Sequence, residues 1–146
     1  EAISEIKVRH YKALNTIWSA CDVLDLCVFA SAPTRLLTLA DMVGLVESIT
    51  GWKSSDYELM RWGERRNHLM RLYNLRQGLG AADDTLPDRF FAEPIAYGRL
   101  AGTRLDRQAF QAAIALYYEM MGWDEQGVPR RSTLIDYGLD QAAENQ

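Results

Sequence analysis

The sequence contains few of the residues that hold metal ions or cross-link a chain. Its 146 residues include two cysteines, two histidines and four prolines. Cys21 and Cys27, six residues apart, are a poor disulfide framework, so we expect an intracellular, reducing location in the cytoplasm. An iron–sulfur cluster needs about four ligands. Two cysteines therefore cannot build such a cluster without ligands from elsewhere.

Long apolar runs and a surplus of positive charge are also absent. No apolar run reaches the roughly 18 residues of a membrane-spanning helix. The net charge is -4, and the basic residues are scattered among acidic ones, so we expect neither a membrane nor a nucleic acid as partner. The chain opens at Glu1 within a helical pattern, as a fragment would, and shows no signal peptide. Its length fits one domain, residues 1–146.

Apolar residues recur at steps of three and four, which is the period of amphipathic helices. This spacing and the capping residues predict three long helices: about 3–29 before Pro33, 39–49 between a Thr38 capping box and Gly51, and from a Ser55 capping box to about Gly78. Two shorter helices are predicted, from Asp106 to Gly122 and from Ser132 or Thr133 to Gly138. No segment alternates apolar and polar residues for long, so the fold class is all-α.

Residues 79–105 lack a clear period and contain Gly80, Pro87, Pro94, Gly98 and Gly102. A loop of this length is uncommon in a compact domain, and it is usually functional or packed on another part of the protein. We therefore predict an irregular multi-helix domain with one long loop.

A carboxylate precedes a cysteine by five residues in an otherwise apolar run, at Asp22 and Cys27, with Asp25 between them. A lone cysteine on a helix is most often a small buried hydrophobe. On a continuous helix Asp22 and Cys27 would also diverge by about 140°, unless the helix ends after Asp22. Two acids in an apolar stretch, however, favour a polar partner, which could be a backbone cap, an arginine or a ligand. Spacing alone therefore favours a buried Cys27 thiol, with a ligand role as the alternative.

The remaining polar residues indicate structure rather than chemistry. His68 has no metal-ligand spacing and is expected to be a hydrogen-bonded core or interface histidine. The arginines between Arg61 and Arg71 fit helical salt bridges, and a minority alternative is one buried arginine that pins Asp83 or Asp84. Phosphate loops, nucleophile elbows and paired-histidine zinc motifs are absent. We therefore assign no catalytic residue in this chain.

Several short segments occur together in one order, over roughly residues 15 to 140: Asp22-x-x-Asp25-Leu26-Cys27, Gly63-Glu64-Arg65-x-Asn67 with Asn74-x-Arg76-x-Gly78, Asp83-Asp84-x-Leu86-Pro87-x-Arg89, Tyr117-Tyr118-x-x-x-Gly122-Trp123-Asp124-x-x-Gly127-x-Pro129, and Leu134-x-x-x-Gly138-Leu139. Each segment is weak alone, and the ordered series is specific. The series resembles the C-terminal region of the tungsten-containing aldehyde ferredoxin oxidoreductase family.

The resemblance implies an enzyme that oxidises aldehydes to carboxylic acids at tungsten, or molybdenum, held by two pterin dithiolenes, with electrons leaving through a 4Fe-4S cluster to ferredoxin. By position in the family motif, Cys27 would ligate the cluster, Asp22 would bind a pterin nitrogen and Leu26 would contact the pterin through its backbone. Asp25 stands where the family has glycine, and its side chain could reach the cofactor. The other cluster cysteines, the first pterin-binding domain and the acid–base residues would lie in upstream domains of the same enzyme.

Two other hypotheses compete with this one. The chain could be a cofactor-free helical scaffold or interaction module, in which Cys27 is a buried thiol. It could also belong to a related complex that acts on another carbonyl or aromatic acyl substrate. An upstream Cys-x-x-Cys-x-x-x-Cys segment would favour the first hypothesis. Under that hypothesis the fragment alone is inactive, exposes apolar surface and is expected to associate, which makes a homo-oligomer one expected partner.

Overall fold

A computed structural model describes residues 3–30 and 37–144 of the chain, and in this part the protein is all-α, as predicted. Its long helices are α1 (Glu5–Val23), α2 (Leu39–Thr50), α3 (Asp56–Arg76) and α5 (Arg107–Met120). The short ones are η1 (Ala81–Asp83), α4 (Arg89–Ala92), α6 (Arg131–Asp136) and α7 (Asp140–Glu144). Within the described residues, β pairing is limited to one isolated bridge between Trp123 and Pro129.

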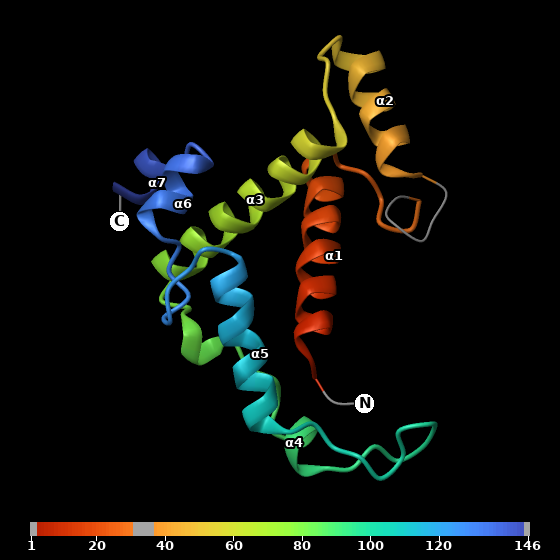
Figure 1. Ribbon diagram of the computed structural model, residues 1–146, viewed down its shortest axis with the longest axis vertical. Helices are drawn as coiled ribbons and strands as arrows, with labels where there is room; N and C mark the ends of the chain where they lie inside the picture. Colours follow the sequence, from red (N-terminus) through yellow and green to blue (C-terminus); the bar gives the residue numbers. More distant parts are fainter. Residues whose placement is uncertain (1–2, 31–36, 145–146) are drawn as a thin grey trace.

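Helix α3 is the central element, and it packs against α1, α2 and α7, while α1 also packs against α5. Figure 1 shows α3 running diagonally through the molecule, with α2 set apart near one end and α6 and α7 at the other. The loop between α4 and α5 extends away from the helices at the opposite side from α2. No helix in the described residues is long and apolar enough to cross a membrane.

The capping residues place the helix starts where the sequence predicts them. The Thr38 hydroxyl accepts a hydrogen bond from the Asp41 N–H, and Asp41 Oδ2 accepts one from the Thr38 N–H at 2.7 Å. Ser55 caps α3 by accepting a hydrogen bond from the Glu58 N–H, and Asp106 caps α5 by accepting one from the Ala109 N–H. Helix α6 begins at Arg131, just before its predicted start, and Pro33 lies outside the described residues.

A close crossing of α1 and α3 depends on Gly63. An added Cβ at this position would lie 2.1 Å from the Thr16 carbonyl oxygen and 2.9 Å from the Ala20 nitrogen. Beside the crossing, Ala20, Cys21, Met42 and Leu59 form a buried core cluster. The missing side chain of Gly63 therefore sets the distance between the two helices and the position of every side chain that bridges them.

His68 lies in the core on α3, which confirms the predicted structural histidine. It is fully buried, and the Trp123 Nε1–H donates a hydrogen bond to its Nδ1 at 2.9 Å. Burial lowers the pKa of His68 to about 4 because the charged imidazolium would lose its hydration. The ring is therefore neutral at physiological pH, and this hydrogen bond ties α3 to the turn that follows α5.

The predicted long loop, residues 79–105, is confirmed in position but contains the short helices η1 and α4. Its second half is a hairpin-like arm closed by backbone hydrogen bonds, with Ile95 N–H donating to the Thr103 carbonyl at 2.8 Å. Tyr97 near its tip is 85% exposed. The arm is held by its own backbone and presents its tip away from the helices (Figure 1).

Replacing Gly63 by Ala should destabilise the protein by about 3 kcal/mol, the upper range for overpacking, because backbone atoms cannot yield to the new methyl group. Chemical denaturation of the purified protein measures this change. Gly44→Ala is the matched control, since Gly44 is exposed inside α2 with nothing within 4 Å of its Cβ position, and should stabilise by about 1 kcal/mol. Equal effects of the two substitutions would contradict the close crossing.

Acid should destabilise the protein through His68. The unfolded chain binds the imidazole proton near pH 6.5 and the folded chain only near pH 4, so stability is full above pH 6.5 and falls between these values. The slope from one proton is at most about 1.4 kcal/mol per pH unit. His68→Gln keeps an acceptor for Trp123 and should flatten the slope measured by denaturation at several pH values. Equal slopes in this variant and in His10→Gln, which removes an exposed imidazole, would refute the assignment.

Candidate functional site

Helix α1 ends at Val23, so the predicted continuation to residue 29 is wrong. The end is a Schellman motif, in which the Leu26 N–H donates to the Cys21 carbonyl at 2.9 Å and the Asp25 N–H donates to the Asp22 carbonyl at 3.3 Å. Asp25 supplies the left-handed residue that this motif requires, with φ 52°. The chain thus leaves the helical path after Val23, between Asp22 and Cys27, and the 140° divergence expected for a continuous helix does not apply.

Asp25 is the one non-glycine residue with positive φ among the described residues. Glycine adopts this conformation without steric cost, and aspartate is one of the few other residues that tolerate it. A glycine in the related family's motif therefore has a plain physical explanation as the helix stop. The Asp25 side chain is exposed to solvent, although the residues around it in the sequence are apolar.

The stop gives Leu26 and Cys27 opposite environments. The Leu26 side chain is half-buried against the core cluster that contains Cys21 and Met42. The Leu26 N–H already donates a hydrogen bond within the Schellman motif. A ligand that contacts the Leu26 backbone would therefore bind its carbonyl oxygen. Cys27 is exposed, whereas Cys21 is buried with its Sγ 3.9 Å from the sulfur of Met42. The buried thiol of this pair is therefore Cys21, and Cys27 lies where it can meet a ligand.

Asp22 lies in the last turn of α1, and its side chain is 53% exposed. Its polar partner is an arginine of α3, because the Arg66 guanidinium lies 3.1 Å from Asp22 Oδ2. The same guanidinium donates to Ser19 Oγ at 3.1 Å, and Ser19 is buried. Arg66 thus fixes the carboxylate against the helix from which it projects.

An apolar groove of 470 Å³ adjoins this ion pair between α1, α2 and α3. Its walls include Val23, Trp52, Trp62 and Leu69 together with the Arg66 side chain. Trp52 is 68% exposed, which is unusual for so large an apolar side chain. The C-terminal end of α1 is therefore bordered by apolar surface.

The described residues do not hold a complete metal site. Among residues 3–30 and 37–144, no three His, Cys, Asp or Glu side chains are grouped so that they could bind a metal ion. The donor types at the end of α1 nevertheless suit two different groups, because a thiolate is a soft ligand for iron and a carboxylate accepts charge-assisted hydrogen bonds from amino groups. The exposed Cys27 and Asp22 fit an iron–sulfur cluster and a pterin whose other contacts come from elsewhere.

Arg71 is the buried arginine that pins the long loop, which confirms the minority alternative from the sequence. Its Nη1 lies 2.8 Å from Asp84 Oδ2, and its Nε donates to the Gly127 carbonyl at 2.7 Å. The Tyr118 hydroxyl donates to the same Asp84 oxygen. Gly127, at φ 72°, has no room for a Cβ, which would lie 2.0 Å from Arg71 Nη2. This network joins α3, α5, the long loop and the turn after α5.

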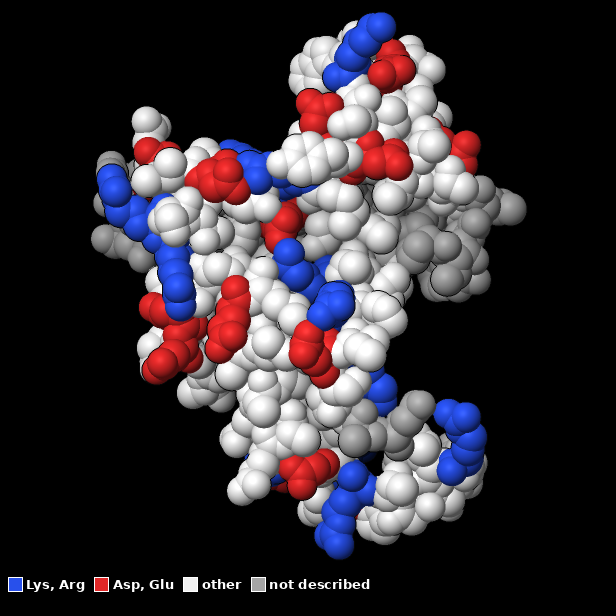
Figure 2. Space-filling view, in the orientation of Figure 1, with Lys and Arg blue, Asp and Glu red and all other residues white. Residues whose placement is uncertain are grey.

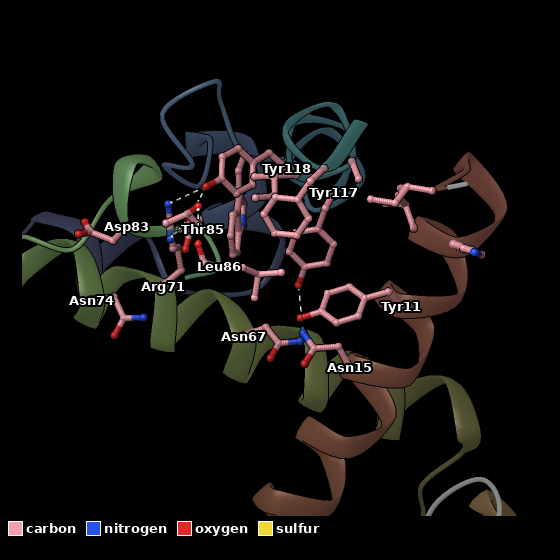
Figure 3. A pocket seen from close by; sticks show the side chains of 18 of the residues that line it. Tyr11, Asn15, Asn67, Arg71, Asn74, Asp83, Thr85, Leu86, Tyr117 and Tyr118 are labelled. Atoms are coloured by element: carbon pink, nitrogen blue, oxygen red, sulfur yellow. Dashed lines mark hydrogen bonds and ion pairs between the residues drawn. The ribbon is translucent and has the colours of Figure 1, made fainter. Parts of the chain in front are cut away.

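A cavity of 680 Å³ opens between α1, α3 and α5, and the spacing of residues gave no sign of it. Figure 3 shows Arg71 and Tyr118 at one end and Tyr11, Asn15 and Tyr117 at the other. Asn15 Nδ2 donates to the Tyr117 hydroxyl at 3.0 Å. Burial raises the pKa of Tyr117 and of Tyr118 to about 12, so both hydroxyls are protonated and neither is a general base at physiological pH.

The charged surface does not mark a further site. Figure 2 shows acidic and basic side chains interleaved over most of this face, in line with the net charge of -4. Such mixing gives no field of one sign to attract a polyanion. The face shown in Figure 2 therefore carries no large patch of one charge sign.

The described residues form an all-α domain in which one helix end carries a carboxylate, Asp22, followed by an exposed thiol, Cys27. Residues 2–139 match the family model described as aldehyde ferredoxin oxidoreductase, domains 2 and 3. The chain belongs to this family of oxidoreductase enzymes, as the sequence resemblance indicates.

The relatives show how much of such an enzyme the chain represents. The tungsten-containing aldehyde ferredoxin oxidoreductase of Pyrococcus horikoshii is 30% identical over 140 residues, which are 95% of this chain and 22% of the relative. That of Pyrococcus furiosus is 30% identical over 138 residues, 94% of this chain and 22% of the relative. The chain thus spans about a fifth of the length of these relatives.

A solved structure shares the fold at lower sequence identity. It is the active site complex BamBC of benzoyl coenzyme A reductase in complex with 1,5-dienoyl-CoA, with a TM-score of 0.78 and 17% identity over 97% of this chain and 20% of that one. At this identity the likeness shows the fold alone. The helical arrangement therefore occurs in a protein of different substrate chemistry.

Replacing Asp25 by Gly should stabilise the protein by about 0.5–1 kcal/mol, because glycine adopts the left-handed conformation without strain. Asp25→Val should destabilise it by about 1–2 kcal/mol, since a β-branched residue is disfavoured at positive φ. Thermal unfolding of the two variants beside the parent protein measures both effects. A parent that unfolds at a higher temperature than Asp25→Gly would contradict the helix-stop role.

Proposed function

We propose that this protein is the C-terminal part, residues 1–146, of a tungstopterin and 4Fe-4S oxidoreductase that oxidises aldehydes to carboxylic acids with ferredoxin as electron acceptor. Membership of the family supports the proposal. The observation that carries it is the end of α1, where a Schellman stop leaves Asp22 on the last turn and Cys27 exposed beyond it.

In this proposal Cys27 is the cluster ligand that the chain contributes. A thiolate binds iron through a soft, anionic donor, and exposure beyond the helix end leaves it accessible to a cluster whose other cysteines come from upstream domains. The hydrogen bond from the Ala30 N–H to the Cys27 carbonyl at 2.9 Å closes a turn at this residue. The turn and the helix stop together hold the thiol in a fixed place.

Asp22 is the proposed partner of the pterin. Its carboxylate, paired with the Arg66 guanidinium, accepts hydrogen bonds from ring N–H and amino groups. The Leu26 carbonyl oxygen and the Asp25 side chain are the proposed additional contacts. When bound, a tungsten or molybdenum bis-pterin supplies the two-electron oxidation of the substrate carbonyl carbon. This chain binds and orients that group, and residues of the upstream domains supply the acid–base steps.

One short segment that contacts both cofactors keeps them close together. Asp22 and Cys27 are separated by four residues and one tight turn, so the groups they bind are held within reach of each other for electron transfer. Ferredoxin then receives the electrons in the cytoplasm, where a reducing environment prevents Cys27 from forming a disulfide instead of binding the cluster. The exposed apolar groove beside Trp52 is proposed to pack against the upstream domains of the enzyme.

The scaffold alternative is weaker on one specific observation. It assigns Cys27 to the core, yet Cys27 is exposed and Cys21 is the buried thiol. The third hypothesis, a subunit acting on another carbonyl or aromatic acyl substrate, uses the same cofactor residues and differs in substrate alone. The substrate class is therefore a question for the upstream domains, and the site in this chain is common to both hypotheses.

Replacing Cys27 by Ala in the complete enzyme should abolish the EPR signal of the reduced cluster, because three thiolates do not hold a 4Fe-4S cluster in its native form. Anaerobic purification, iron analysis and EPR of the dithionite-reduced enzyme measure the effect. The folded content should stay unchanged, since the exposed Cys27 side chain is not part of a core cluster.

Cys21→Ala is the matched control for this experiment. It removes the buried thiol that packs against Met42, so it should cost about 1 kcal/mol of stability and leave the cluster signal intact. A normal cluster signal in the Cys27→Ala enzyme would remove Cys27 from the ligand set. An open reading frame without an upstream Cys-x-x-Cys-x-x-x-Cys segment, and without a partner that carries one, would refute the proposed function as a whole.

A further inference from the structure

The position of Asp22 is unfavourable for its own helix. The last turn of a helix carries partial negative charge, so a carboxylate there is electrostatically unfavourable. Helix α1 has no basic residue in this turn to offset the cost. A cation from another helix, Arg66 of α3, lies 3.1 Å from Asp22 instead. The positive charge that offsets the Asp22 carboxylate at the end of α1 therefore comes from α3.

Arg66 is held in a definite geometry. One terminal nitrogen of its guanidinium lies 3.1 Å from Asp22 Oδ2, and the other donates to Ser19 Oγ at 3.1 Å. Ser19 is 2% exposed and lies nearly one helical turn before Asp22. The planar fork of the guanidinium thus spans a buried hydroxyl and the carboxylate. This geometry is possible because Gly63, one turn earlier on α3, lets the two helices approach closely.

We propose that Arg66 is a positioning residue for the cofactor, and that it fixes the orientation of the Asp22 carboxylate toward the pterin through its fork between Ser19 and Asp22. The inference rests on the proposed function, since it requires that Asp22 binds the pterin. It adds a residue from a second helix, outside the Asp22–Cys27 segment, to the site. Arg66 acts through Asp22 and need not touch the cofactor itself.

A purely structural ion pair would behave differently. The Arg66 side chain is 35% exposed and that of Asp22 is 53% exposed, and ion pairs of this kind contribute little to stability. The pair therefore holds geometry rather than the fold. Removing Arg66 should leave the protein folded while freeing the Asp22 carboxylate to rotate, and this separates a positioning role from a structural one.

The test compares Arg66→Met with Arg66→Lys in the complete enzyme. We expect Arg66→Met to lower the pterin and tungsten bound per chain by about tenfold, the smaller effect seen when a partner of a metal-site residue is lost. The residual W(V) EPR signal should also change its g values. Arg66→Lys keeps the positive charge but lacks the planar guanidinium that bridges Ser19 and Asp22. It should therefore restore most of the pterin and tungsten content but not the native g values. Content and g values equal to the parent in Arg66→Met would overturn the inference.

Arg61→Met is the matched control. Arg61 is another α3 arginine with a carboxylate partner, Asp136, at 2.7 Å, and it has a similar exposure, 28% against 35%. Its loss should leave cofactor content and g values unchanged. An equal loss of pterin in Arg61→Met and Arg66→Met would show that removing either ion pair of α3 impairs pterin binding. This result would overturn the specific role of Arg66.

A double variant distinguishes failure of this inference from failure of the proposed function. If Arg66 acts through Asp22, then Asp22→Ala alone and Asp22→Ala with Arg66→Met should bind equally little pterin, because the second change has nothing left to position. A further loss in the double variant would overturn the positioning role and leave Asp22 as a pterin ligand. Native pterin content in Asp22→Ala would overturn the proposed role of Asp22 and, with it, that of Arg66.

Discussion

The close crossing of α1 and α3 at Gly63 is the constraint on which the other features depend. The backbone of α3 reaches the Thr16 carbonyl of α1 because no side chain stands between them. At this separation Arg66, on the next turn of α3, reaches both Ser19 and Asp22. A wider crossing would leave Asp22 uncompensated at the negative end of α1. Packing in the core thus determines the electrostatics at the C-terminal end of α1.

The opposite half of the molecule is held by a buried polar network together with two small apolar clusters, one around Leu72 and one around Tyr118. Arg71 joins Asp84 of the long loop to the Gly127 carbonyl, and His68 joins α3 to Trp123. Buried charges are costly unless paired and hydrogen-bonded, so each partner fixes the others. This network lets a loop as long as residues 79–105 take one conformation with few apolar contacts of its own.

The sequence predicted those parts of the structure that depend on local chemistry. Thr38, Ser55 and Asp106 mark helix starts because their side chains cap neighbouring N–H groups. The end of α1 was missed because aspartate, unlike glycine, does not signal a left-handed residue. The partners of Arg71 lie up to 56 residues away, and periodicity carries no information on such pairings. The candidate site residues came from the ordered family motif, since spacing alone favoured a buried Cys27.

The end of α1 contains two locally unfavourable choices, and this is itself evidence for function. Asp25 occupies a conformation in which glycine would be more stable, and Asp22 places a second carboxylate at the negative end of the same helix. Sequences that fold well agree with their structure at each position, and exceptions concentrate at functional sites. Arg66 offsets the charge of Asp22 alone. The exposed Asp25 carboxylate lies just beyond the same helix end, so Arg66 compensates one of the two negative charges there.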